Sequence, residues 1–381
     1  MAPAPHRTQG PPRVLLAGGG TGGHVYPAIA IADAIRNLDE EAALMFAGTR
    51  ERMEWDAVPR AGYSIFPIRV SGLHRELSRR TLQFPLKLVQ GFADSRRLVS
   101  DFDADVAVGT GGYVSGPVLM AASMRGVPIV IQEQNAYAGL TNRMLGRRAE
   151  RVHIAFAEAE QYFPPSRCRL SGNPTRMELL KADPAEARVH FQVPSDARVL
   201  LVFGGSLGSS AINDAVERLL PGLLYQEDRF VIWQSGARYY EALSQRIDEH
   251  PRLRLLRYLD RMDLAYAVAE LAVCRAGAIT CSELMVTGTP AILVPSPNVA
   301  ADHQTKNAKS MRQAGAADLL PESGLEAQLV PRVDDLMNDA GTRASMAAAA
   351  RAMARPDAAR DIATDVLEVA RQAGHRRRVQ T

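Results

Sequence analysis

Glycine-rich segments follow short apolar runs at three places in the chain. They are Gly18-Gly19-Gly20-Thr21-Gly22-Gly23-His24, Gly109-Thr110-Gly111-Gly112-Tyr113 and Gly204-Gly205-Ser206. Glycine lets the backbone turn tightly after a strand, and it lets N–H groups at the start of a helix approach a phosphate. The pattern therefore predicts phosphate or diphosphate sites, with the titratable side chain of His24 beside the first of them.

The first loop also satisfies the dinucleotide pattern Gly-x-Gly-x-x-Gly at Gly18, Gly20 and Gly23. An NAD site further needs an acidic residue about 20 residues later, at the end of the second strand. That strand is expected to end before Thr49, and Glu51 lies slightly beyond it. The sequence thus favours a phosphate or diphosphate site over an NAD site. For either of the first two loops taken alone, the alternative is a purely structural turn that connects a strand to a helix.

His24 is the first candidate for a general base, because an unperturbed imidazole titrates near ~6.5. The alternative is a structural role, in which the ring binds its own loop or the diphosphate of an acceptor. Glu133, directly after another apolar run, is the second candidate base.

Three features of the second half suit a nucleotide sugar. Arg176 is a charge-assisted donor for a diphosphate or an ordinary surface arginine. Glu283 follows the apolar run that ends at Cys274, and its carboxylate can accept both hydroxyls of a ribose or complement a helix N-terminus. The segment Asp302-His303-Gln304-Thr305-Lys306-Asn307 suits several sugar hydroxyls, or it is a helix capped by Asp302.

The acidic and sulfur-containing residues give no metal site. Asp101-Phe102-Asp103-Ala104-Asp105 resembles a metal-binding Asp-x-Asp, but it precedes a predicted strand and so belongs to the amino edge of the sheet, whereas ligands bind at the carboxyl edge. We interpret it as a solvated turn. Cys168, Cys274 and Cys281 have no CxxC spacing, which predicts buried thiols without a disulfide or zinc.

The elements that position these residues alternate between apolar strands and amphipathic helices. Strands are expected at 14–17, 43–47, 64–68, 106–109, 129–132 and 152–155, and again at 199–203, 230–234, 253–257, 271–274 and 291–294. Such alternation predicts an α/β protein with doubly wound parallel sheets. Because the pattern repeats after half a chain, we expect two nucleotide-type domains with a cleft between them.

The domain limits follow from breakers and tails. Ser171-Gly172-Asn173-Pro174 is the strongest internal breaker and marks the first crossing between domains. We predict a disordered tail at 1–12, a first domain at 13–172 that includes a returning helix at 356–372, a second domain at 173–355, and a basic tail at 373–381.

Composition excludes several classes of protein. Of the 381 residues, 46% are hydrophobic and 23% charged, as in an ordinary globular chain, and the formal charge of +3 is too small to indicate nucleic acid. No apolar run approaches the ~20 residues of a membrane span. However, residues 73–99 mix large apolar side chains with Arg79, Arg80 and Lys87, and 118–120 are apolar. We interpret these segments as a membrane-surface patch, although a helix packed on its sheet explains part of the pattern.

The motifs taken together resemble the MurG family of bacterial N-acetylglucosaminyltransferases. The resemblance covers residues 13–310 in the family's order. It rests on the segments 18–27, 109–117, 132–142, 171–176, 204–208, 275–283 and 302–308. It implies the GT-B fold, in which two Rossmann-like domains face a cleft. Leu207 departs from the family, which often has a polar residue there.

The resemblance also implies the roles of individual residues. Arg176 and Ser206 would hold the donor diphosphate, the backbone of Leu259 would meet uracil, Glu283 the ribose, and Gln304 the sugar. The remaining donor contacts would come from Thr21, Gly22, Gly23, Asn135, Ala278, Ile279, Thr280, Cys281 and Ser282. The acceptor diphosphate would lie against Gly20, Gly111, Gly112 and Tyr113.

The activity implied is inverting transfer of GlcNAc from UDP-GlcNAc to the 4-hydroxyl of MurNAc in lipid I, giving lipid II for peptidoglycan. No cofactor or protein-bound metal is expected. Implied partners are the anionic cytoplasmic face of the plasma membrane and the cell-wall and division machinery, and nucleic acid is not among them. The alternatives are a diacylglycerol glycosyltransferase of the same fold, a UDP-GlcNAc 2-epimerase, or a catalytically silent nucleotide-binding scaffold.

Overall fold

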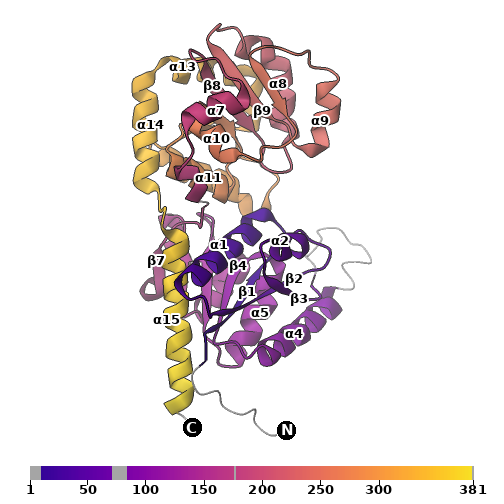
Figure 1. Cartoon of the computed structure of the whole chain (residues 1–381), viewed down its shortest axis with the longest axis vertical. Helices are drawn as coiled ribbons and strands as arrows, with labels where there is room; N and C mark the ends of the chain where they lie inside the picture. Colours follow the sequence, from indigo (N-terminus) through magenta and orange to yellow (C-terminus); the bar gives the residue numbers. More distant parts are fainter. Residues whose placement is uncertain (1–9, 71–83, 176, 380–381) are drawn as a thin grey trace. The chain divides into compact units, whose positions relative to one another are not determined.

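The computed structural model describes residues 10–70, 84–175 and 177–379. The chain divides into two compact units (Figure 1). The first consists of Met1–Gln134, Ala138–Pro174 and Asp357–Thr381, and the second of Asn135–Tyr137 and Thr175–Pro356. The C-terminal segment thus belongs to the first unit, and the chain passes into the second after Pro174.

The first unit is built on a parallel sheet, which has seven strands among the described residues, in the order β3-β2-β1-β4-β5-β6-β7. The strands are β1 (Arg13–Gly18), β2 (Ala43–Gly48), β3 (Ser64–Pro67), β4 (Val106–Gly111), β5 (Ile129–Glu133), β6 (Arg151–Ile154) and β7 (Cys168–Leu170). The order reverses between β1 and β4, so the loops after these two strands are neighbours at the carboxyl edge. Such a reversal is where ligands bind in α/β sheets.

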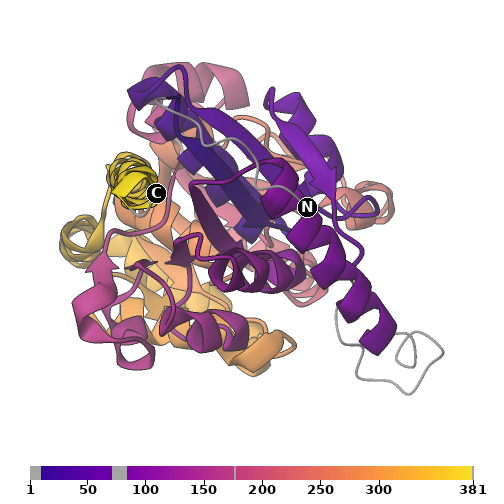
Figure 2. The ribbon, with the colours of Figure 1, turned by 90° about the horizontal axis from the view of Figure 1, so that it is seen from below.

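Two helical layers cover this sheet because successive strand residues point to opposite faces. Val14 and Leu16 pack with α1 and α15 on one face, whereas Leu15 and Ala17 pack with α4 and α5 on the other. In Figure 2, α15 is seen end-on, in yellow. Among its described residues, the helices of this unit are α1 (Gly22–Leu38), α2 (Glu54–Arg60), α4 (Phe84–Asp101), α5 (Gly112–Met124), α6 (Leu140–Gly146) and α15 (Ala358–Val379), with short 3-10 turns at Ala157–Tyr162 and Pro165–Arg167.

An ion pair with a buried carboxylate fastens α15 to the sheet. Asp365 of α15 accepts from Arg169 of β7 at 2.5 Å and lies 3.5 Å from Nε2 of His153. The pKa of His153 is lowered to about 3, mainly by burial and to a smaller extent by the positive charges of Arg169 and Arg151. This histidine is therefore neutral near pH 7, and its Nδ1 lies 2.8 Å from the Ser171 hydroxyl.

The second unit is a parallel sheet of six described strands in the order β10-β9-β8-β11-β12-β13. The strands are β8 (Arg198–Phe203), β9 (Arg229–Gln234), β10 (Leu253–Leu256), β11 (Ala269–Cys274), β12 (Ala291–Leu293) and β13 (Asp318–Leu319). The helices are α7 (Pro184–Phe191), α8 (Ser210–Leu223), α9 (Ala237–Ser244), α10 (Met262–Val268), α11 (Ala278–Thr287), α12 (His303–Gln313), α13 (Leu325–Asn338) and α14 (Ala340–Met353), with short 3-10 turns at Met177–Leu180, Ala300–Asp302 and Glu322–Gly324.

Several sequence predictions differ from the structure. Helix α15 continues to Val379, so most of the predicted basic tail is helical. Pro12 is already bound to the sheet, because its carbonyl accepts from Ala43 N at 2.8 Å. Val118 and Leu119 are fully buried in the core, and Met120 packs against that core, so this segment is not a membrane surface. Arg79 and Arg80 lie outside the described residues, as does the side chain of Lys87.

Candidate active site

The loop between β1 and α1 is held by a carboxylate that the sequence analysis missed. Glu54, at the start of α2, is fully buried. Its Oε2 accepts from Gly20 N at 3.0 Å, and its Oε1 accepts from the N–H of Thr49 at 3.1 Å and the hydroxyl of Thr49 at 2.6 Å. The acid that follows the second strand therefore binds the loop itself, which disfavours the NAD interpretation further. The sequence signal that could have identified Glu54 was its place as an acidic residue shortly after Glu51 and the second strand.

The second glycine loop, where β4 ends at Gly111 and α5 begins at Gly112, lies directly against the first loop. Gly111 and Gly112 have φ values of 104° and 81°, which favour glycine. A Cβ on Gly112 would lie 2.1 Å from the carbonyl oxygen of Gly19, and one on Gly111 would lie 2.7 Å from Nδ1 of His24. The two glycine loops are therefore packed against each other, and Tyr113, which follows Gly112, is 59% exposed.

His24, in the first turn of α1, is held from both its ring and its backbone. Its Nδ1 lies 3.0 Å from the carbonyl oxygen of Thr110 and 3.2 Å from Oε1 of Gln134. The hydroxyl of Thr110 donates to the carbonyl oxygen of His24 at 2.7 Å. The half-buried imidazole is thus fixed next to both glycine loops. Thr21, Gly22 and Gly23 form the start of the same helix.

Glu133 has a different environment from the one expected of a base. It is 2% exposed, and its Oε2 accepts from Gly139 N at 3.0 Å and from Nδ2 of Asn142 at 2.8 Å. These contacts brace the loop between β5 and α6. The geometry therefore favours a structural role for Glu133 and leaves His24 as the stronger candidate base.

The short segment Asn135–Tyr137 groups with the second unit. Asn307 of α12 is fully buried, and its Oδ1 accepts from Ala136 N at 2.9 Å. Its Nδ2 donates to Asn135 at 3.2 Å and to the carbonyl of Ala276 at 3.2 Å. Asn307 thereby ties Asn135 to the loop before α11, a role that the polar segment 302–307 did not reveal.

The first turns of helix α11 form a candidate binding site in the second unit. It begins at Ala278 after Gly277, which has no side chain to cap the helix, so the first turn at Ala278, Ile279 and Thr280 suits an anion. Glu283 is 8% exposed, and its Oε2 accepts from the Tyr266 hydroxyl at 3.1 Å. This hydrogen bond fixes the carboxylate one turn into the helix.

The start of α12 and the loop after β10 lie at the same carboxyl edge of this sheet. Gln304 uses its Oε1 to accept from Ser296 N at 2.9 Å, which leaves its amide nitrogen to donate to a sugar hydroxyl. Leu259, after β10, has a buried side chain, so the backbone is the part of this residue suited to a ligand. Arg176 lies outside the described residues.

Comparison with known proteins is consistent with this geometry. Residues 14–154 match the glycosyltransferase family 28 N-terminal domain, and residues 199–362 match the glycosyltransferase family 28 C-terminal domain. The chain belongs to glycosyltransferase family 28. It is therefore a glycosyltransferase, and the two units correspond to the two domains of the family.

Curated relatives of this family 28 chain carry one name, UDP-N-acetylglucosamine--N-acetylmuramyl-(pentapeptide) pyrophosphoryl-undecaprenol N-acetylglucosamine transferase. The protein of that name from Salinibacter ruber is 59% identical over 94% of this chain and 97% of its own length. That from Cytophaga hutchinsonii is 40% identical over 95% and 98%.

Solved structures of other proteins are similar to this chain over almost its whole length. MurG from Acinetobacter baumannii has a TM-score of 0.76 at 29% identity and covers 94% of this chain and 100% of its own. The structure of a putative UDP-N-acetylglucosamine 2-epimerase from Listeria monocytogenes has a TM-score of 0.65 at 14% identity and covers 92% of this chain and 94% of its own, which shows a shared fold alone. The predicted fold class, two α/β domains with parallel sheets, is confirmed.

Three donor-side residues of this family 28 chain have surroundings that only the structure shows. Helix α8 begins at Ser210, and Ser209 caps it through Ile212 N at 3.3 Å, so Ser206 is an exposed loop residue and does not start the helix. Cys281 is fully buried, with a pKa that burial raises to about 12. The Ser282 hydroxyl donates to the carbonyl of Ala278 at 3.0 Å. The helix turns both of these side chains towards the interior, away from a ligand at its N-terminus.

The acidic turn before β4 lies at the amino edge of the sheet, as predicted. Oδ2 of Asp105 accepts from the backbone N–H of Arg13, the first residue of β1, at 3.0 Å. Over the part of the chain that the structure describes, no group of three or more His, Cys, Asp or Glu residues is placed to hold a metal ion.

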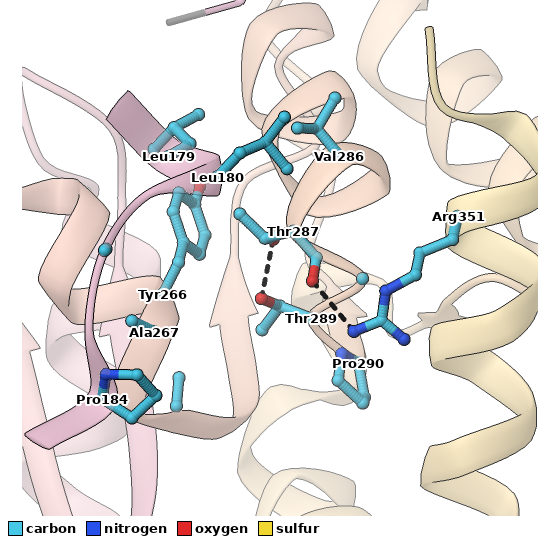
Figure 3. Close-up of a pocket in the computed structure, with 13 residues that line it drawn as sticks. Leu179, Leu180, Pro184, Tyr266, Ala267, Val286, Thr287, Thr289, Pro290 and Arg351 are labelled. Carbon is cyan, nitrogen blue, oxygen red and sulfur yellow. Dashed lines mark hydrogen bonds between the residues drawn. The ribbon is translucent and has the colours of Figure 1, made fainter. Parts of the chain in front are cut away.

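A cavity of about 380 Å³ lies behind the α11 site (Figure 3). Tyr266 and Val286 line it, with Thr287 and Thr289 joined by a hydrogen bond of 2.8 Å. Arg351 of α14 donates to the carbonyl of Thr287 at 3.2 Å and so holds the C-terminal end of α11. The ring of Tyr266 therefore lines the cavity, while the hydroxyl of the same residue donates a hydrogen bond to Glu283.

Proposed function

We propose that the chain transfers N-acetylglucosamine from UDP-GlcNAc to the N-acetylmuramyl sugar of pyrophosphoryl-undecaprenol-linked pentapeptide, a step of peptidoglycan synthesis. The observation that carries the proposal is 59% identity over 94% of the chain to a relative with that name. The site supports it, because a diphosphate-type helix start, a fixed carboxylate and a fixed imidazole are the parts that such a transfer needs.

The chemistry is an in-line displacement. His24 would take the proton of the 4-hydroxyl of the acceptor sugar as that oxygen forms a bond to C1 of GlcNAc, while the bond from C1 to the UDP oxygen breaks. Because the acceptor oxygen attacks C1 from the side opposite the leaving UDP, the configuration of the anomeric carbon is inverted. The carbonyl oxygen of Thr110 and the amide oxygen of Gln134 are acceptors beside Nδ1, so the neutral ring carries its proton on Nδ1 and would use Nε2 as the base.

Protein groups would neutralise the leaving diphosphate. We assign this task to the first turn of α11 and to Arg176, with Glu283 on the ribose and Gln304 on the sugar. The acceptor diphosphate would lie along the two glycine loops of the first unit. Since Asp105 is engaged at the opposite edge of its sheet, the proposal includes no protein-bound metal.

Transfer of labelled GlcNAc to a lipid I analogue tests the function. We expect UDP-GlcNAc to be used and diacylglycerol to be refused as acceptor, with UDP-glucose and UDP-GalNAc as competing donors. Transfer to diacylglycerol, or release of free N-acetylmannosamine without any acceptor, would instead favour the lipid glycosyltransferase or the epimerase.

Removal of the Tyr266 hydroxyl should weaken donor binding. In Tyr266→Phe the carboxylate of Glu283 loses a donor at 3.1 Å, and a hydrogen bond to a charged group contributes about 1.5–3 kcal/mol. Because ribose hydroxyls can recover part of this, we expect UDP affinity to fall about 3- to 10-fold, measured by calorimetry. Tyr225→Phe, at an 80% exposed site, is the control and should bind UDP normally. Equal affinity in both variants would contradict the role of Glu283.

We further propose that the enzyme works at the cytoplasmic face of the plasma membrane, beside the cell-wall and division machinery. No helix in the described part of the chain is long and apolar enough to span a bilayer. On α6, Leu140 is 71% exposed and Met144 is 64% exposed. They lie four residues apart and share a face, and the exposed Arg147 and Arg148 follow. An apolar patch with adjacent cations suits an anionic lipid surface.

Charge reversal tests this patch. We expect Arg147→Glu/Arg148→Glu to reduce sedimentation with phosphatidylglycerol vesicles several-fold at low salt, since each cation near such a surface contributes about 1 kcal/mol. The control is Arg60→Glu/Arg360→Glu, which reverses two exposed charges elsewhere in the same unit. Equal loss in both variants would indicate a net-charge effect and contradict the assigned patch.

A further inference from the structure

A chain of buried amides lies behind His24, and the proposed reaction does not yet account for it. Gln132, Gln134 and Asn173 are each at most 2% exposed. Gln134 donates to Oε1 of Gln132 at 2.5 Å, and Gln132 donates to Oδ1 of Asn173 at 2.7 Å. Asn173 returns a hydrogen bond to the backbone carbonyl of Gln134 at 3.1 Å. The three amides thus close a ring that fixes the side chain of Gln134.

The backbone of Thr110 fixes the direction of every hydrogen bond in this chain. A carbonyl can only accept, and that of Thr110 receives the amide nitrogen of Gln134 as well as Nδ1 of His24. Turning the Gln134 amide over would place its oxygen against this carbonyl and against Oε1 of Gln132, which is repulsive. Oε1 of Gln134 must therefore face Nδ1 of His24, at 3.2 Å.

We infer that Gln134 is a positioning residue, which holds His24 in the Nδ1–H tautomer and in one ring plane so that Nε2 is the proton acceptor. The inference rests on the proposed role of His24 as base. A neutral amide suits this position, because a carboxylate there would stabilise the imidazolium and keep the base protonated. Two carboxylates are buried in neighbouring segments, Glu54 on α2 and Glu133 at the end of β5, and they are the same in every variant below.

The decisive measurement is the nitrogen NMR spectrum of imidazole-labelled full-length protein, with the His24 signals assigned by their loss in His24→Gln. In the parent protein we expect the imidazole of His24 to be the Nδ1–H tautomer. In Gln134→Glu the pKa of His24 should rise by about 1–3 units, because a carboxylate replaces the amide oxygen beside Nδ1–H. The acidic limb of the pH profile of kcat/KM should shift upward by the same amount. Gln161→Glu, on an exposed 3-10 turn of the same unit, is the charge control and should shift neither.

Gln134→Met keeps the side-chain length and removes the hydrogen bonds of the side-chain amide to His24, Thr110 and Gln132. We expect kcat to fall about 10-fold while KM for UDP-GlcNAc changes less than about 2-fold, because a misoriented base slows the chemical step only. A parent ring in the Nε2–H tautomer, or an unchanged His24 pKa in Gln134→Glu, overturns the inference even where His24→Gln is inactive. Full activity of His24→Gln with the expected tautomer would instead overturn the proposed base, so the two failures are distinguishable.

Discussion

His24→Gln should lower turnover by about 10²- to 10⁴-fold, the usual contribution of a positioned general base. The affinity for UDP should change less than about 2-fold, because the residues assigned to the nucleotide lie on the second unit. Glutamine keeps a polar side chain of similar reach, so the hydrogen bond to Thr110 can survive while the proton acceptor is lost. Turnover is measured as labelled GlcNAc transferred to a lipid I analogue, and affinity by calorimetry with UDP.

The matched control for this variant is His190→Gln, since His190 is exposed on α7. It should show parental turnover and affinity. A His24→Gln enzyme with parental turnover would remove the base from the mechanism. A variant that lost donor affinity as much as turnover would mean that His24 binds substrate and does not move the proton.

The sequence predicted the strands well because each is an apolar run closed by glycine or a polar turn. It missed β7 and β13, which have three and two residues and carry no periodic signal. The glycine loops were located correctly because glycine is needed at φ values such as the 104° of Gly111. Local backbone chemistry of this kind is visible in sequence.

The positions of side chains around the site were harder to predict, because they depend on helix phase and on distant partners. Cys281 and Ser282 follow the first turn of α11 in sequence, yet the rotation of the helix buries them. Ser206 and Ser209 are equivalent by type, and only the structure shows that Ser209 caps α8. Gln134 looked like part of a motif, but the orientation of its amide depends on a carbonyl 24 residues earlier.

Glu54→Ala should be the most destabilising single change at the glycine loop. The carboxylate accepts from Gly20 N, Thr49 N and the Thr49 hydroxyl, and alanine would leave these donors without their acceptor. Each buried polar group left unsatisfied costs about 1–3 kcal/mol, and partial access of water reduces the sum. We expect the free energy of unfolding to fall by about 2–4 kcal/mol, measured by urea denaturation of the full chain.

The same change should reach the chemistry, because Gly20 belongs to the loop that leads into His24. We expect turnover to fall at least about 10-fold at a temperature where Glu54→Ala is still folded, with UDP affinity unchanged. Glu51→Ala, an exposed acid three residues earlier, removes the same charge and should alter neither stability nor turnover. Glu54→Gln separates the two effects: its amide oxygen can serve only part of the three donors, so stability should recover in part. If Glu54→Ala were as stable and active as Glu51→Ala, the loop would be held by its glycines alone, and the acid beyond the second strand would have no part in positioning the base.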